Sequence, residues 1–147
     1  MKAIQLRPYQ LQAMRAIQGA LENGQKHIVV EMATGTGKGL VLAKTVELLH
    51  KQSMSNVLVV TKKTELKKQV EHNLFSIHQD YLLVDQDRIT VATEQGLLRH
   101  SYEESNEYQF VIFDEIDVSE SIYKKLNCIE KTVIVFSAKY TNKPHRL

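Results

Sequence analysis

Three of the six glycines in the sequence, Gly35, Gly37 and Gly39, stand close together around Lys38. Glycines this dense form either a flexible turn or a place where the backbone closely approaches another group. Successive backbone N–H groups in such a loop can converge on an anion, and a lysine can reach the outer phosphates of a nucleotide as a point charge. We therefore predict a phosphate-binding loop made of Thr34, Gly35, Thr36, Gly37, Lys38 and Gly39.

The segments on either side of this loop support that interpretation. Residues 27–32 form a short apolar run with β-branched members, which is typical of a buried strand. After the loop, Leu40, Ala43, Val46 and Leu49 recur at helical spacing. The order strand, glycine loop, helix places the loop at a helix N-terminus, whose positive dipole end attracts anions. This context favours a phosphate site over a simple turn.

A pair of acids, Asp114 and Glu115, follows the apolar run at residues 111–113. In open α/β sheets, ligands bind at the carboxyl ends of the strands. One carboxylate there can hold Mg²⁺ and the next can polarise an attacking water. The alternative is two solvated acids at a strand end. Because a phosphate-binding loop precedes them in the chain, we predict that Asp114 binds the metal and that Glu115 is catalytic.

The remaining sequence alternates between strands and helices. Strands are expected at residues 27–32, 56–60, 88–92, 110–113 and 132–136, and helices at 8–20, after the loop, and at about 64–77, 94–98 and 120–126. The strands are nearly continuous apolar runs, as a sheet covered on both faces requires. The sequence therefore predicts an α/β fold, a three-layer sandwich with a mainly parallel sheet. Residues 102–107 look like a loop and residues 141–147 like a tail.

Length and composition bound the class of protein. With 147 residues, 43% of them hydrophobic and 24% charged, we expect a single globular domain covering residues 1–147. The net charge of +2 neither demands nor forbids nucleic acid. The single cysteine, Cys128, and the six histidines have no metal-ligand spacing. No apolar run approaches a membrane span and no signal peptide is evident, so we expect a cytoplasmic protein without a membrane partner.

Four motifs occur in order along the chain: LRPYQ at residues 6–10, MATGTGKG at 32–39, DEID at 114–117 and SAK at 137–139. Together they resemble the first RecA-like domain of a superfamily 2 helicase or translocase, of the DEAD/DEAH-like and restriction-enzyme motor branch. The resemblance implies a P-loop RecA-like fold with ATP and Mg²⁺ as cofactors. It also implies that Gln10, with Arg7, selects adenine, and it agrees with the roles given above to Lys38, Asp114 and Glu115.

The nucleic-acid contacts are implied by the same resemblance. Thr61, Lys62 and Lys63 follow the second strand, and Thr93 and Gln95 follow the third. In the family, loops at these places grip the phosphate backbone of a single strand without reading its sequence. The expected partner is therefore DNA or RNA, as a single strand or within a duplex. The alternative is that the lysines belong to a solvated helix face. No aromatic residue is interleaved with them, so base stacking is not indicated.

Three departures from the family pattern concern activity. Gly39 stands where the family has a Thr or Ser whose hydroxyl ligates Mg²⁺, and Lys139 stands where it has Thr; Asp117 is a tolerated variation. Only eight residues follow Lys139 in the 147-residue sequence, so we expect the second RecA-like domain, with its arginine finger, to be absent. The resemblance then implies a poor ATPase in isolation.

The function expected from the sequence is therefore the ATP-binding domain of a DNA or RNA helicase or an ATP-driven translocase. It would hydrolyse ATP together with a second RecA-like domain in the same or another chain. The alternative is a non-hydrolysing nucleotide- or nucleic-acid-binding adaptor, which Gly39 and Lys139 favour. A small-molecule kinase is disfavoured because no lid segment or substrate-clamping arginine cluster is evident.

Overall fold

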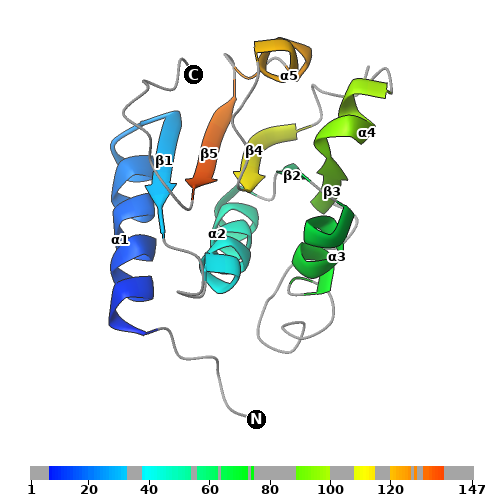
Figure 1. Cartoon of the computed structure of the whole chain (residues 1–147). Helices are drawn as coiled ribbons and strands as arrows, with labels where there is room; N and C mark the ends of the chain where they lie inside the picture. Colours follow the sequence, from blue (N-terminus) through cyan, green and yellow to red (C-terminus); the bar gives the residue numbers. More distant parts are fainter. Residues whose placement is uncertain are drawn as a thin grey trace.

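The structure, a computed structural model, describes residues 7–32, 38–53, 56–62, 64–72, 74, 89–99, 108–114, 120–126, 128 and 131–137. Five helices and five strands alternate along these residues (Figure 1). The helices are α1 (Pro8–Glu22), α2 (Lys38–Ser53), α3 (Thr64–His72), α4 (Glu94–Arg99) and α5 (Glu120–Lys125). The strands are β1 (His27–Glu31), β2 (Asn56–Thr61), β3 (Ile89–Thr93), β4 (Tyr108–Asp114) and β5 (Thr132–Ser137).

The five strands form one sheet in the order β1-β5-β4-β2-β3, and every neighbouring pair is parallel. The strands nearest the middle are buried apolar runs; β2, for example, is buried from Val57 to Thr61. A parallel sheet needs cover on both faces, which is why its strands lack the alternating polar residues of a half-exposed sheet. The predicted parallel α/β sheet is therefore confirmed.

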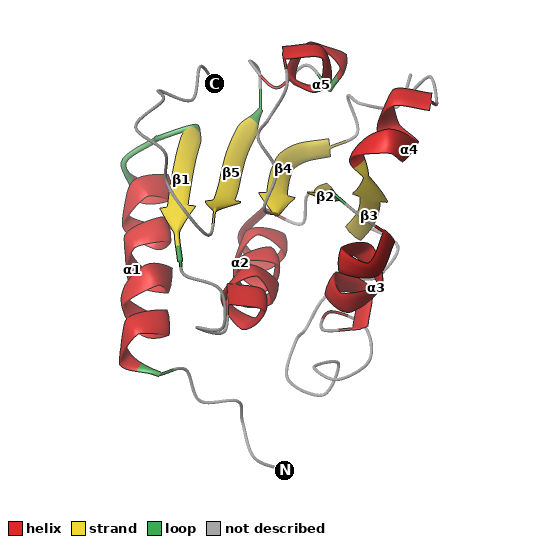
Figure 2. Ribbon diagram, in the orientation of Figure 1, coloured by secondary structure: helices red, strands yellow, loops and turns green. Residues whose placement is uncertain are grey.

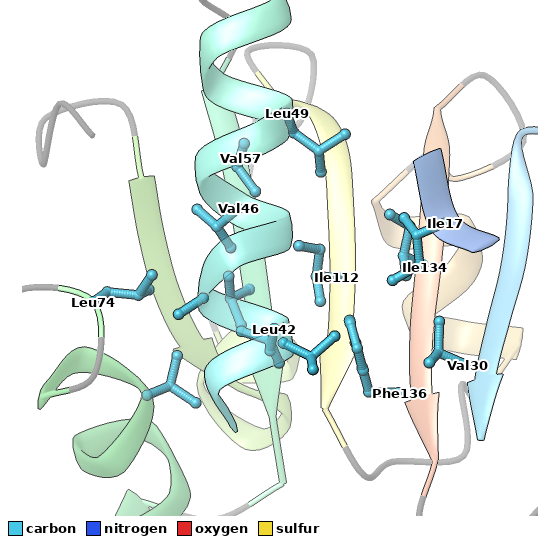
Figure 3. Close-up of a cluster of buried hydrophobic side chains, with 14 of the residues drawn as sticks. Ile17, Val30, Leu42, Val46, Leu49, Val57, Leu74, Ile112, Ile134 and Phe136 are labelled. Atoms are coloured by element: carbon cyan, nitrogen blue, oxygen red, sulfur yellow. The ribbon is translucent and has the colours of Figure 1, made fainter. Parts of the chain in front are cut away.

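Helices lie on both faces of the sheet, which gives three layers (Figure 2). One core joins α1, α2 and α3 to one face, where Ile17 and Leu42 pack toward Ile134 and Phe136 (Figure 3). A second core joins α4 and α5 to the opposite face. Successive residues of β4 alternate between them, because strand side chains point to opposite faces in turn. Ile112 thus belongs to the first core, and Val111 and Phe113 to the second.

Helix α1 is well delimited by its sequence. Pro8 occupies the first turn, where its missing N–H costs nothing, after an extended Arg7 with φ −68° and ψ 158°. At the other end, Gly24 adopts a positive φ of 77°, which glycine reaches without the steric cost of a β-carbon. Pro8 and Gly24 thus mark the two ends of α1. The helix lies beside β1, the strand that follows it in the chain (Figure 1).

The element boundaries follow the expectations with small differences. Strand β4 begins at Tyr108, two positions early, because that side chain is buried and its hydroxyl lies 3.0 Å from Oγ1 of Thr90 on β3. Helix α3 is described to His72, and the rest of the helix predicted to residue 77, apart from Leu74, lies outside the described residues. The same is true of the expected loop at 102–107 and tail at 141–147. None of the described helices combines the length and the apolarity that crossing a lipid bilayer takes.

Candidate functional site

The carboxyl ends of the five parallel strands lie together at one end of the sheet, which we call its carboxyl edge. In the parallel register Asp114 is paired with Thr61 on one side and with Phe136 on the other, and Thr61 is paired with Thr93. Glu31 is paired with Ser137 in the same way. The register therefore brings the predicted metal ligand and two predicted nucleic-acid residues to the edge where ligands bind in open α/β sheets.

Lys38 and Asp114 form an ion pair at this edge, with Nζ of the lysine 3.0 Å from Oδ1 of the aspartate. Asp114 lies at the carboxyl end of β4, two residues after Ile112, and therefore faces the helix layer that contains α2. Lys38 is the first residue of α2. The two side chains are only 11% and 9% exposed, so water screens their attraction weakly. The structure thus brings together the predicted phosphate ligand and the predicted metal ligand.

Several predicted site residues lie outside the described residues. They are Thr34, Gly35, Thr36 and Gly37 of the loop, the acid Glu115, Lys63, and Asp117 and Lys139 of the motifs. Gly39, the second residue of α2, is described and is partly buried. It places no hydroxyl next to Lys38.

The start of the loop is attached to the end of β5. The N–H of Met32, the last described residue before the loop, donates to the carbonyl of Ser137 at 2.9 Å. Ser137 opens the SAK motif and Met32 opens the MATGTGKG segment, so this bond joins the first residues of the two motifs. Sequence reasoning placed both segments but not their contact, which depends on β5 lying beside β1.

Gln10 has a structural role that the sequence analysis did not assign to it. Its side chain is 5% exposed, and Oε1 accepts a hydrogen bond from the N–H of Arg7 at 2.9 Å. A side chain at this third helical position that reaches back to the N-cap N–H is one half of a capping box. The guanidinium of Arg7 is exposed and lies 3.5 Å from the hydroxyl of Tyr9.

The predicted nucleic-acid residues differ in how accessible they are. Thr61 is fully buried, whereas Lys62 directly after it is exposed. Thr93 caps α4, because its Oγ1 accepts a hydrogen bond from the N–H of Gly96 at 3.1 Å. Gln95 on the first turn of α4 is exposed. Lys62 and Gln95 therefore present their side chains to solvent, while the two threonines are engaged in the fold.

An open hollow of about 620 Å³ lies between α1 and the edge strand β1. Its walls include Tyr9, Ala13 and Ala16 from the helix and the stretch from Ile28 to Met32 from the strand. Neither Lys38 nor Asp114 lines it, so we regard it as separate from the ion-pair site.

The buried hydroxyl of Thr45, away from the carboxyl edge, has its hydrogen-bonding needs met within the packing. Oγ1 of Thr45 donates to the carbonyl of Val41 at 2.7 Å and contacts Sδ of Met14 at 3.5 Å, which satisfies its hydroxyl between α1 and α2.

Burial raises the pKa of the Cys128 thiol to about 11, and the nearby Lys131 charge only partly opposes this effect. A thiol with that pKa is protonated at neutral pH and is a poor nucleophile.

The family comparison bears directly on this arrangement. The family model described as "Type III restriction enzyme, res subunit" matches residues 3–141. The chain belongs to this family. The match covers every motif from LRPYQ to SAK, including Lys38 and Asp114.

Relatives of this res-subunit domain include larger proteins. This chain is 28% identical over 137 residues to the endonuclease subunit of the type I restriction enzyme EcoKI from Escherichia coli strain K12. The match covers 82% of this chain and 12% of the endonuclease subunit. The UvsW helicase of bacteriophage T4 shares the fold with a TM-score of 0.68 and 19% identity, over 94% of this chain and 54% of the other. The SWI2/SNF2 ATPase core of Sulfolobus solfataricus was solved in complex with double-stranded DNA. It has a TM-score of 0.70 and 20% identity, over 98% of this chain and 34% of the other.

These comparisons confirm the superfamily 2 resemblance and the RecA-like fold of the res-subunit domain. The chain spans only 12% of the curated relative and 54% and 34% of the two solved chains, so it corresponds to one part of each.

Proposed function

We propose that this chain is the ATP-binding domain of an ATP-driven helicase or translocase that acts on DNA or RNA. The observation that carries the proposal is the ion pair between Lys38 and Asp114, at the carboxyl edge of a parallel sheet and at the N-terminus of α2. A lysine and a carboxylate at such an edge suit the two charges of a metal-bound nucleotide, which are anionic phosphates and a divalent cation.

The described residues fit both cofactors. Lys38 and the N-terminal N–H groups of α2 would hold the phosphates of ATP, and Asp114 offers the carboxylate oxygens that Mg²⁺ prefers. When it is bound, Mg²⁺ supplies charge neutralisation on the phosphate oxygens. Gly39 contributes no hydroxyl ligand, so Asp114 has the larger share in holding the metal. We assign the polarising of water to Glu115, which lies outside the described residues.

Hydrolysis by the isolated chain is expected to be slow. Phosphoryl transfer in this class of enzyme depends on an arginine that a second domain supplies, worth about 10³ to 10⁵ in rate. We infer that a second RecA-like domain, in the rest of a longer polypeptide or in another chain, completes the site. The partial coverage of the relatives supports this view.

A thermal-shift panel tests nucleotide binding directly. ADP and a non-hydrolysable ATP analogue with Mg²⁺ should raise the melting temperature, because a ligand at about 100 times its Kd stabilises the folded state by about 2.7 kcal/mol. Lys38→Ala should lose this shift. Lys44→Ala, which removes a lysine of the same helix paired with Glu47 at 3.5 Å, should keep it. If no nucleotide shifts the wild-type chain with or without Mg²⁺, the proposal is wrong.

The nucleic-acid part of the proposal depends on Lys62, which is exposed at the carboxyl end of β2. Fluorescence anisotropy with a labelled single-stranded oligonucleotide should show weaker binding for Lys62→Ala and a salt slope smaller by about 0.7, because one phosphate contact is lost. Lys26→Ala is the matched control, since Lys26 is exposed but precedes β1 at the opposite edge of the sheet. Equal effects of both variants would contradict a specific contact at Lys62.

The adaptor alternative rests on Gly39 and on Lys139, the latter outside the described residues. It predicts nucleotide binding that does not depend on Mg²⁺ and no gain in hydrolysis when a second RecA-like domain is added. Two measurements separate the motor domain from the adaptor. The thermal-shift panel is repeated in EDTA, and hydrolysis is measured with the second domain present.

A further inference from the structure

Strand β1 has an outer side that no other described strand covers. It stands at the end of the order β1-β5-β4-β2-β3, and among the described strands it pairs with β5 alone. Even-numbered residues make its backbone bonds to β5, as the N–H of Met32 at 2.9 Å and the carbonyl of Lys26 at 2.7 Å show. Successive residues of a strand turn their N–H and C=O groups to opposite sides. The backbone groups of His27, Val29 and Glu31 therefore point away from the sheet.

Helix α1 lies beside this outer side and leaves a space next to it (Figure 1). The hollow of about 620 Å³ has Tyr9, Ala13 and Ala16 of the helix in one wall and Ile28 and Val30 of the strand in the other. Both strand residues belong to the core on the α1 side of the sheet. The place next to β1 thus offers unpaired ladder groups and a largely apolar cover. A further strand of a parallel sheet needs both of these.

We propose that the outer side of β1, together with the facing wall of α1, is a docking groove for one extended segment of a partner polypeptide. The segment adds a strand parallel to β1, in continuity with a sheet whose neighbouring strands are all parallel. In this mode of recognition the main-chain hydrogen bonds give affinity, and the pockets for alternate side chains give specificity. The groove does not depend on the proposed nucleotide site, since Lys38 does not line the hollow.

The walls and charges of the groove define the segment that fits it. Side chains that point toward α1 must be apolar, because Ala13 and Ala16 form that wall. Lys26, just before β1, and Glu31, at its end, are both exposed and place opposite charges at the two ends of the strand. Opposite charges on neighbouring strands attract. A parallel segment therefore fits best with an acidic residue at its start, apolar residues at every second position and a basic residue at its end.

A second copy of this chain suits the groove less well than a single segment. If two copies paired antiparallel through β1, both α1 helices would lie on the same side of the joined sheet. Each helix would then approach the hollow that the other helix already walls. A single extended segment brings no helix with it, so the space between α1 and β1 can receive its side chains.

A designed peptide tests the groove on the intact chain by fluorescence anisotropy. The labelled probe DVTVTVK carries valines for the α1 wall and charges matched to Lys26 and Glu31. Ile28 and Val30, which face the α1 side, turn their N–H groups toward β5, so the valines of a parallel strand should turn theirs toward β1. N-methylation of two valines should weaken binding about tenfold, because two hydrogen bonds are lost. N-methylation of the two threonines, whose N–H groups point away from β1, should leave binding unchanged.

Three variants of the chain locate the bound peptide. Ala16→Asp puts a charge into the apolar wall and should weaken binding of the probe about tenfold. Gln18→Asp is the matched control, since this exposed residue of α1 is not among the described residues that line the hollow. The wild type should prefer DVTVTVK to DVTVTVE about two- to fivefold, as exposed charge pairs allow, and Glu31→Lys should reverse the preference. Circular dichroism verifies the fold of each variant.

The docking groove is supported if only the valine-methylated peptide loses binding and only Ala16→Asp among the α1 variants weakens it. Failure of the probe to bind the folded wild-type chain would overturn it. Equal binding of the two N-methylated peptides, or equal losses in Ala16→Asp and Gln18→Asp, would also overturn it. Sedimentation gives a last check: a wild-type dimer that Ala16→Asp dissociates would assign the outer side of β1 to a second copy, against the proposal.

Discussion

Oε1 of Gln10 accepts a hydrogen bond from the N–H of Arg7 at 2.9 Å, so the residue proposed to select adenine also caps helix α1. The side-chain oxygen of Gln10 accepts the hydrogen bond that caps the helix, and the side-chain NH₂ group can donate to a base. A variant can therefore keep one role and lose the other, because capping needs only the acceptor oxygen.

Gln10 variants should separate stability from base preference. Gln10→Ala should lose both the cap, at a cost of about 1 kcal/mol in unfolding free energy, and the preference for ADP over GDP. Gln10→Glu retains the acceptor for the Arg7 N–H and is favoured by the helix dipole, but it buries a carboxylate at a position that is 5% exposed, so the cap should persist with a desolvation cost while the preference disappears. Urea unfolding and competition between ADP and GDP measure the two effects. A Gln10→Glu variant that still prefers ADP would contradict the adenine assignment.

Gly39→Thr should strengthen the magnesium dependence of nucleotide binding. The substitution puts a hydroxyl next to Lys38, at the position where the family resemblance implies a metal ligand. Gly39→Ala is the control, because it also replaces glycine and gains helix propensity, by at most about 1 kcal/mol and by more than Thr gains, without adding an oxygen ligand. The ratio of ADP affinities with Mg²⁺ and with EDTA should rise for Thr and not for Ala. Equal ratios in the two variants would show that the hydroxyl is not used.

The cap of α4 gives a stability test in which two residues are coupled. A β-carbon at Gly96 would stand 3.0 Å from Oγ1 of Thr93, so Gly96→Ala must disturb the hydroxyl that caps the helix. We expect Thr93→Ala to destabilise the chain by about 1 kcal/mol. Gly96→Ala should be neutral or unfavourable in the wild type and favourable, by less than about 1 kcal/mol, in the Thr93→Ala background. A double-mutant cycle from urea unfolding measures this, and additive effects would contradict the coupling.

Cys128 should make the fold less stable at alkaline pH. Burial raises the pKa of its thiol to about 11 from the ordinary value of 9.0, so the folded state holds the proton more tightly than the unfolded state. The unfolding free energy should therefore fall as the pH rises from about 9 to about 11. Comparison with Cys128→Ala isolates this contribution from other groups that titrate in the same range. If both proteins lose stability equally with pH, the shift does not arise from the thiol.

The strands were predictable because their residues satisfy one strong requirement. Residues such as Val57 to Val60 are apolar and β-branched or leucine throughout, which suits a sheet covered on both faces. The sequence does not reveal that β5 lies between β1 and β4, because the spatial order of the strands depends on packing between distant segments. The bond between Met32 and Ser137 follows from that order and was not predictable for the same reason.

The sequence predicts candidate site residues one by one, but it does not predict the contacts between them. The types and spacing of Lys38 and Asp114 indicated their separate roles, whereas their ion pair depends on which face of the sheet α2 covers. Once that face is known, the alternation of β4 places Asp114, in step with Ile112, on the side of the helix. Thr61 illustrates the opposite case, since a strand-end threonine looks the same in sequence whether it is exposed or, as here, fully buried.

The measurement that tests the central claim most directly is a calorimetric titration of the chain with ADP, in Mg²⁺ and in EDTA, beside Lys38→Ala. We predict one site per chain, an affinity that is higher in Mg²⁺ than in EDTA, and loss of the binding heat in the variant. Absence of binding by the wild type, or binding that Lys38→Ala leaves unchanged, would contradict the assignment of the sheet edge around Lys38 and Asp114 as a nucleotide site.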